Sequence, residues 1–211
     1  MIVRTSTYML PFRTRYALGE RLGVGATAEV YRCTHRASRR QYACKVINKT
    51  RLTSTQLADL AAEVDVMHAL NHHSIVHLKE GKEEGDFVYL VLEEMHGGEL
   101  FDRILDAPEG RLSEQDARRL LYNLTCAVAY MHSKGYAHRD LKPENVLLDA
   151  PRDARIQATS MKLADFGISA RVPASLRDGE GGCRDGNAVE RAMPFHRICG
   201  SPEYMAPEVI R

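Results

Sequence analysis

Two short segments in the second half of the sequence carry residues suited to phosphate chemistry. Residues 138–145 read His-Arg-Asp-Leu-Lys-Pro-Glu-Asn. They offer two groups that can bind Mg²⁺ or accept a proton, a lysine that can bind phosphate, and an arginine. Residues 165–167 read Asp-Phe-Gly, and a carboxylate on a glycine-containing turn suits Mg²⁺ coordination. Asp-Phe-Gly alone is frequent by chance, whereas the longer segment is not. Together they predict magnesium-assisted chemistry at a phosphate.

A glycine-containing turn in the first half could bring backbone amides close to phosphates. Residues 23–30 read Gly-Val-Gly-Ala-Thr-Ala-Glu-Val, and glycines let N–H groups approach a phosphate unobstructed. Ala28 replaces the third glycine of a Gly-x-Gly-x-x-Gly pattern, and an ordinary hairpin explains the segment about equally well. No Gly-Lys-Ser/Thr follows, so this is not a Walker motif, and the strand that comes next argues against a dinucleotide fingerprint.

A lysine and a glutamate in the first half lie at positions where simple solvation is unfavourable. Strand periodicity places Lys45 on the same face as Ala43 and Ile47, so it calls for an anionic partner. Glu63 falls inside the apolar stripe of a helix predicted over 54–70, where a carboxylate must be paired or remain costly. Lys45 is its natural partner. The alternatives are an edge-strand lysine and a stripe-edge glutamate that reaches solvent.

The elements that would position these residues form a sheet followed by a helical part. Strands are predicted over 16–23, 28–34, 40–47, 75–80, 87–92, 145–148 and 161–164. Besides the helix over 54–70, a second helix begins after Ser113, whose spacing to Asp116 is typical of a capping box, and runs to Gly135. The change of pattern near 93–98 indicates two lobes with a cleft between them.

Composition excludes several classes of protein. The 211 residues are 44% hydrophobic and 27% charged, which excludes disorder over most of the chain. The 29 basic and 28 acidic residues leave no excess that would indicate nucleic acid, and no run approaches the ~20 apolar residues of a membrane helix. Five cysteines without Cys-x-x-Cys spacing argue against a disulfide framework and a zinc site. We expect no nucleic-acid or membrane partner, and a cytoplasmic location with the nucleus as the alternative.

Together and in this order, the motifs resemble those of the eukaryotic protein kinases. The order is glycine-rich turn, strand lysine, helix glutamate, catalytic loop, Asp-Phe-Gly and, at 206–208, Ala-Pro-Glu. The resemblance covers about residues 16–211. Lys142 with the Pro-Glu-Asn after it, and Gly-Ser-Pro-Glu-Tyr at 200–204, match the serine/threonine branch. Residues 89–104 look like the calcium/calmodulin-dependent kinase group.

The resemblance implies an α+β, bilobal protein-kinase-like fold. Its parts would be an N-terminal extension at 1–15, a small antiparallel-sheet N-lobe at about 16–92, a hinge at 93–98, and an incomplete, mainly helical C-lobe at 99–211. The chain stops three residues after Ala-Pro-Glu. We therefore expect a truncated kinase domain in which apolar faces in 117–131 and around 198–209 are exposed.

The resemblance also implies which polar residues carry the chemistry. Asp140 would accept the proton of the substrate hydroxyl, and Lys142 would stabilise the transferred phosphoryl group. Lys45, held by Glu63, would pair with the α- and β-phosphates of ATP. The Mg²⁺ ligands would be Asn145 and Asp165.

The ATP site implied by the resemblance is built from the glycine-rich turn, the strands and the hinge. Its residues would be Leu22, Gly23, Val24, Gly25, Ala26, Thr27, Ala28, Glu29, Val30, Ala43, Lys45, Leu92, Glu93, Met95, Glu99 and Leu147. Leu92 would be the gatekeeper, the backbone of Glu93 and Met95 would bond the adenine edge, and Glu99 would bond the ribose. A regulatory spine would stack Met67, Leu78, His138 and Phe166.

Two polar segments and one substitution depart from the family pattern. Residues 149–160 and 173–195 read as insertions. Arg197 stands three residues before Gly200, where the family has a phosphothreonine. We therefore expect activation not to use the conventional loop site.

The resemblance implies an ATP-dependent serine/threonine protein kinase that transfers the γ-phosphate of ATP to a Ser/Thr hydroxyl, with ATP and Mg²⁺ as cofactors. Glu99 and Glu144 match positions where basophilic relatives read basic residues upstream of the target, unless they serve only the ribose and the loop. Calmodulin is not expected as a partner, because no segment for it follows the kinase-like region. The alternative is a truncated or non-catalytic ATP-binding module that acts by interaction, and a third reading is a chain that folds only with a partner.

Overall fold

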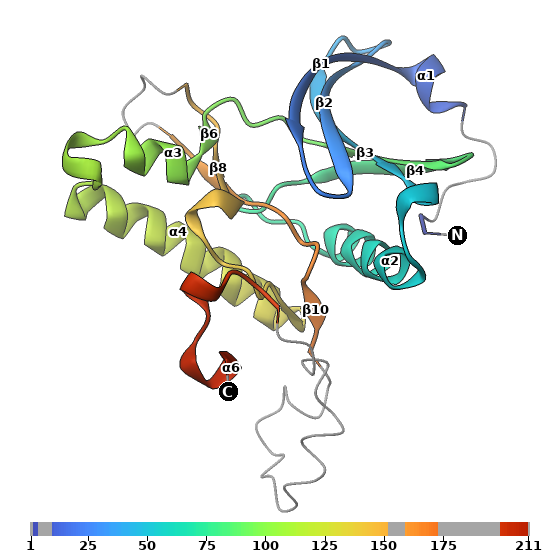
Figure 1. The fold of residues 1–211 in the computed structure, drawn as a ribbon. Coiled ribbons are helices and arrows are strands. Elements are labelled where there is room, and N and C mark those ends of the chain that lie inside the picture. Colours follow the sequence, from blue (N-terminus) through green and yellow to red (C-terminus); the bar gives the residue numbers. More distant parts are fainter. Residues whose placement is uncertain (1, 4–9, 152–158, 173–198, 211) are drawn as a thin grey trace, which may run out of the picture.

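The computed structural model describes residues 2–3, 10–151, 159–172 and 199–210, which form two lobes (Figure 1). The predicted insertion at 173–195 and Arg197 lie outside the described residues, as does most of the insertion at 149–160.

The first lobe is built on a five-stranded antiparallel sheet. Its strands are β1 (Tyr16–Val24), β2 (Ala28–His35), β3 (Gln41–Asn48), β4 (Leu78–Glu84) and β5 (Phe87–Leu92). They lie in the order β1-β2-β3-β5-β4. Helix α2 (Ser54–Ala69) runs beneath the sheet (Figure 1) and starts in a capping box between Thr53 and Gln56. A single 3-10 turn, Lys49–Arg51, follows β3.

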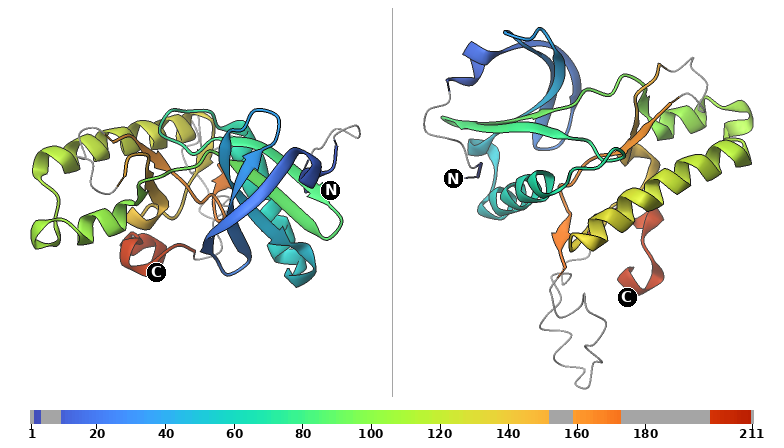
Figure 2. Two further views of the ribbon diagram at one scale, coloured as in Figure 1. Left: turned by 90° about the horizontal axis from the view of Figure 1, so that it is seen from above. Right: turned by 180° about the vertical axis from the view of Figure 1, so that it is seen from behind.

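The second lobe is mainly helical. Its helices are α3 (Leu100–Leu105), α4 (Glu114–Ser133) and the short α6 (Pro207–Ile210), with 3-10 turns at Pro108–Gly110, Pro143–Asn145 and Pro202–Tyr204. Its short strands are β6 (Gly98–Glu99), β7 (Tyr136–Ala137), β8 (Val146–Leu148), β9 (Met161–Leu163) and β10 (Ala170–Arg171). Ser113 caps α4 as predicted, since its Oγ accepts from the Asp116 amide at 3.1 Å. Seen from behind, the sheet with α2 and the α3–α4 pair are distinct bodies (Figure 2).

The strand predicted over 75–80 is wrong at its start. β4 begins at Leu78, whereas Ile75 forms a parallel bridge to Leu163 in β9. The Val76 amide donates to the Leu163 carbonyl at 2.9 Å, and Ile75 is buried. The apolar run is therefore buried against the second lobe and not by pairing within the sheet, a difference that strand periodicity does not reveal.

The side chains predicted to form a spine are buried along the junction of the lobes. Met67, Leu78 and Phe166 belong to one core cluster, and the rings of His138 and Phe166 meet edge to face with centroids 5.3 Å apart. Nε2 of His138 bonds the Ala164 carbonyl at 3.0 Å. Burial lowers the pKa of His138, so the ring is neutral at physiological pH. The neutral ring holds the backbone of Ala164, directly before Asp165, through this hydrogen bond.

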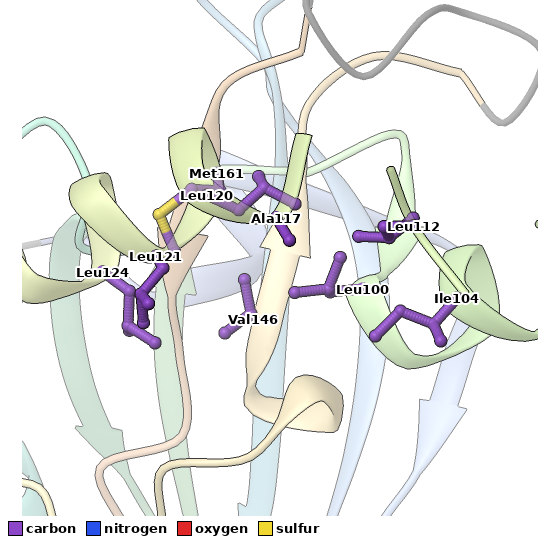
Figure 3. A pocket seen from close by; sticks show the side chains of 9 residues that line it. All are labelled: Leu100, Ile104, Leu112, Ala117, Leu120, Leu121, Leu124, Val146 and Met161. Atoms are coloured by element: carbon purple, nitrogen blue, oxygen red, sulfur yellow. The ribbon is translucent and has the colours of Figure 1, made fainter. Parts of the chain in front are cut away.

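An apolar groove separates α3 from α4 (Figure 3). The cavity measures about 180 Å³ and is lined by Leu100, Ile104, Leu112, Ala117, Leu120, Leu121, Leu124, Val146 and Met161. The prediction of exposed apolar side chains in 117–131 is confirmed for Leu121 and Tyr122, and that around 198–209 for Tyr204 and Val209. The side chains of 117–131 that are instead buried are Leu120, Ala127 and Met131.

None of the helices in the described ranges combines the length and apolar character that a bilayer crossing requires.

The segment before β1 packs onto the sheet through an aromatic cluster. Helix α1 (Phe12–Arg15) places the Phe12 ring against Tyr89 of β5, with centroids 4.1 Å apart and nearly parallel planes. Phe12 also stacks on Tyr16 at 5.2 Å and is 1% exposed. Its amide donates to Oε2 of Glu84 at 2.8 Å. Phe12 thus covers the face of the sheet opposite α2.

Replacing Phe12 by alanine should therefore destabilise the first lobe. We expect a loss of about 3–5 kcal/mol in the free energy of unfolding, because the substitution removes a buried ring and leaves a cavity. Denaturant unfolding would measure it. Leu10→Ala is the matched control, since Leu10 is exposed and its loss should cost no more than about 0.5 kcal/mol. Equal stability of the two variants would show that α1 is dispensable.

Candidate active site

Lys45 and Glu63 meet as the sequence predicts. Nζ of Lys45 on β3 lies 2.5 Å from Oε1 of Glu63 on α2, and the Glu63 side chain is only 8% exposed. Burial disfavours the charge on Lys45, yet the Glu63 and Asp165 carboxylates together raise the pKa of the ammonium. A charged lysine is thus held at the junction of the lobes.

The Asp-Phe-Gly turn lies against this ion pair. A side chain at Gly167 would place its Cβ 3.9 Å from Oε2 of Glu63 and 3.3 Å from Oδ1 of Asp165. Asp165 has a φ of 57°, a left-handed conformation that costs energy in a non-glycine residue. The Gly167 amide donates to Oδ1 of Asp165 at 3.3 Å. Asp165 is exposed, so its carboxylate can meet a cation, and its charge acts on Lys45 by raising the pKa of the ammonium.

In the loop at 138–145 of the second lobe, Asp140 is the most extensively hydrogen-bonded carboxylate. Its Oδ2 lies 3.0 Å from Nζ of Lys142 and accepts from Nδ2 of Asn145 at 2.9 Å. Its Oδ1 accepts from both the amide and the hydroxyl of Ser201, each at 2.9 Å. Burial opposes ionisation, but the bonds from Lys142, Ser201 and Asn145 outweigh it and lower the pKa of Asp140. The group is a carboxylate at neutral pH and can accept a proton.

Lys142 completes this cluster. Its Nζ donates to Oγ of Ser201 at 2.7 Å in addition to its contact with Asp140. The hydrogen bond to Asp140 raises the pKa of Lys142, although partial burial works against it. The site therefore holds a fixed positive charge next to the Asp140 carboxylate.

Ser201 is a site residue that the sequence reasoning did not single out. It belongs to the quoted segment 200–204, in which the sequence reasoning gave no single residue a role. Its place depends on Gly200, whose φ of 111° favours glycine and whose added Cβ would lie 2.7 Å from the Arg139 carbonyl. A glycine directly before a hydroxyl residue was the signal that could have identified it.

The residues predicted to bind the nucleotide lie on elements of both lobes. Ala43 pairs with Leu92 across β3 and β5, and Leu147 on β8 pairs with Glu99 on β6. The glycine-rich turn joins β1 to β2, with Gly23 opposite Val30. The turn residues whose side chains or backbone are mostly exposed are Leu22, Val24, Gly25, Ala26 and Thr27, whereas Gly23, Ala28, Glu29 and Val30 are half-buried. A Cβ at Gly23 would meet no heavy atom within 4 Å, so the protein alone does not require a glycine there.

The oxygen atoms of Asp165 and Asn145 suit Mg²⁺ bound together with substrate phosphates better than a metal ion whose ligands all come from the protein. In the described ranges, no group of three or more His, Cys, Asp or Glu side chains is arranged to hold a metal ion. Mg²⁺ keeps several waters and needs only one or two carboxylates beside substrate phosphates. Asp165 supplies one carboxylate, and Asn145 can supply an amide oxygen because its Nδ2 already donates to Asp140.

Comparison with known proteins finds sequence similarity to protein kinases over nearly the whole chain. A family model described as "Protein kinase domain" matches residues 16–211. CBL-interacting protein kinase 11 of Oryza sativa subsp. japonica is 38% identical over 197 residues, which cover 93% of this chain and 35% of that protein. Calcium-dependent protein kinase 11 of Arabidopsis thaliana is 36% identical over 216 aligned residues, covering 99% of this chain and 39% of that protein. The chain thus spans little more than a third of the length of either relative.

Proposed function

Because this chain belongs to the protein kinase family, we propose that it transfers the γ-phosphate of ATP to a serine or threonine hydroxyl of a protein. The observation that carries the proposal is the ionised Asp140 carboxylate, 3.0 Å from the Lys142 ammonium and held by two donors of Ser201. The relatives named as kinases support the same reading. The test is phosphate transfer from Mg-ATP to an Arg-x-x-Ser peptide by purified 1–211, and no transfer above an Asp140→Asn control would overturn it.

In the proposed reaction the substrate oxygen attacks the γ-phosphorus while the bond to the β,γ-bridging oxygen breaks, which releases ADP. The hydroxyl proton passes to the Asp140 carboxylate. Lys142 stabilises the negative charge that develops on the phosphoryl oxygens, and Lys45 holds the α- and β-phosphates. Bound Mg²⁺, held by Asn145 and Asp165, would neutralise phosphate charge.

The nucleotide would lie between the glycine-rich turn and the hinge. The open space at Gly23 leaves room for a phosphate to approach the backbone of the turn. The adenine would lie between Val30, Ala43 and Leu147 and would bond the backbone of Glu93 and Met95. Leu92 would border its inner edge.

The peptide substrate would approach Asp140 from an adjoining cavity. This cavity of about 370 Å³ is lined by Ala137, Arg139, Asp140, Leu141, Cys199, Ser201, Tyr204, Met205, Ala206 and Val209. Its apolar wall suits a side chain next to the target hydroxyl.

The proposal includes a preference for substrates that carry basic residues upstream of the target serine or threonine. Glu99 and Glu144 support it, because burial, Asp102 and Glu144 raise the pKa of Glu99 and Oε2 of Glu144 is buried without a hydrogen-bond partner among the described atoms.

Glu144→Gln should weaken the use of arginine-containing peptides. We expect KM for an Arg-x-x-Ser peptide to rise about tenfold, the equivalent of one lost charge-assisted contact. KM for the same peptide with the arginine replaced by alanine should not change. Glu109→Gln is the control, because the Glu109 side chain is largely exposed and pairs with Arg111. An unchanged KM for the arginine peptide would remove the preference from the proposal.

A non-catalytic ATP-binding module that acts by interaction is the second candidate. The observation that favours it is the apolar groove between α3 and α4, which is lined in part by the exposed side chain of Leu121 (Figure 3). Folded protein that binds Mg-ATP but transfers no phosphate would support this candidate over the first.

A further inference from the structure

The side chain of Glu94 is buried in the hinge, although it is a carboxylate. It is only 4% exposed, and Oε1 accepts from Nε of Arg32 at 2.6 Å. Its other oxygen, Oε2, is buried without a hydrogen-bond partner among the described atoms, and Nδ1 of His96 lies 3.7 Å from Oε1. A buried carboxylate persists only when it is paired, so the Arg32 guanidinium is what holds Glu94 in this position.

Arg32 connects this carboxylate to the strands that carry the glycine-rich turn. Arg32 lies on β2 and also ion-pairs with Glu20 on β1. Glu20 is largely exposed, so this outer contact is weak, whereas the inner contact to buried Glu94 is shielded from solvent. We call the set Glu20–Arg32–Glu94 the hinge latch. It joins the hinge to the β1–β2 hairpin through side chains alone, separately from the backbone ladder through β3 and β5.

We propose that the hinge latch sets ATP affinity by fixing the glycine-rich turn relative to the hinge. This inference rests on the proposed function. Glu94 lies between Glu93 and Met95, whose backbone would bond adenine, and Arg32 lies two residues beyond Val30, at the base of the turn. Adenine and the phosphates belong to one molecule, so fixing the separation of their two binding elements lowers the cost of ordering them when ATP binds. Arg32 and Glu94 are positioning residues, since neither would touch the reacting atoms.

Four proteins test the latch: the wild type, Arg32→Met, Glu94→Met and the double variant. We expect each single variant to raise Kd for Mg-ADP and KM for ATP about tenfold. Arg32→Met leaves the buried Glu94 carboxylate without its partner, and Glu94→Met removes the hinge contact of Arg32, which keeps only its exposed contact to Glu20. kcat and KM for the peptide should stay within about twofold of the wild type, since the Asp140 cluster is not touched. In the double variant two methionine side chains replace the ion pair, so no buried charge is left without a partner. Kd for Mg-ADP and KM for ATP should then return to within about twofold of the wild type.

Arg111→Met is the matched control, because it breaks an ion pair between two largely exposed side chains on the second lobe. It should change no constant. Equal Kd values for the wild type and the single variants would overturn the latch and leave the proposed function standing. A joint loss of kcat and melting temperature that the double variant does not restore would also overturn it, in favour of a purely structural ion pair. Failure of wild-type protein to bind any nucleotide would overturn the proposed function, and the latch with it.

Discussion

Replacing Asp140 by asparagine should reduce phosphate transfer by about 10²–10⁴-fold, the contribution typical of a positioned general base. Asparagine is nearly the same size and can still accept the Ser201 amide bond, so the loop should keep its shape. It cannot take a proton from a hydroxyl, and it removes the charge that faces Lys142 at 3.0 Å. Affinity for Mg-ATP should change by no more than about twofold, because Asp140 would not touch the nucleotide. Single-turnover transfer and calorimetric nucleotide binding would measure the two effects.

Asp86→Asn provides the control for this experiment. Asp86 is an exposed aspartate in the turn between β4 and β5, in the other lobe, and its neutralisation should alter neither rate nor affinity. An Asp140→Asn protein with wild-type transfer would assign the base to another group. A variant that loses nucleotide binding as well would show that the loop, and not the proton transfer, had been damaged.

The local motifs of the site could be predicted from the sequence because each is contiguous. The loop at 138–145 and the Asp-Phe-Gly turn are runs of a few residues, so their residue types alone suggest the chemistry that we propose for them. The Lys45–Glu63 pair could also be predicted, since strand and helix periodicities each left one charge on a buried face. The structure places Nζ and Oε1 of this pair 2.5 Å apart.

Contacts between distant segments could not be predicted in the same way. Ser201 is 61 residues from Asp140 in sequence, and Glu94 is 62 residues from Arg32. Their pairing follows from the way the strands and turns are brought together, which periodicity does not specify. The burial of Ile75 against Leu163 has the same origin, and it misled the prediction of β4 because a run buried between lobes has the composition of a strand.

Replacing Lys45 by methionine should both stop phosphate transfer and weaken the fold. We expect transfer to fall at least about 100-fold, since the α- and β-phosphates would lose their buried cation. We also expect a loss of about 3 kcal/mol in the free energy of unfolding, because Glu63 would keep a buried charge without a partner. Transfer assays and denaturant unfolding on the same preparation would measure both quantities.

The double variant Lys45→Met/Glu63→Leu separates the two consequences. Two apolar side chains in place of the ion pair should restore most of the stability, since no lone buried charge remains, while transfer stays lost. Lys49→Met is the matched control: Lys49 lies in the turn directly after β3 and pairs with Glu83 of β4 at 2.7 Å, within the first lobe. It should cost some stability and leave transfer per folded molecule unchanged. If the double variant recovered transfer together with stability, Lys45 would serve the fold alone, and the phosphates would have to be held by other groups.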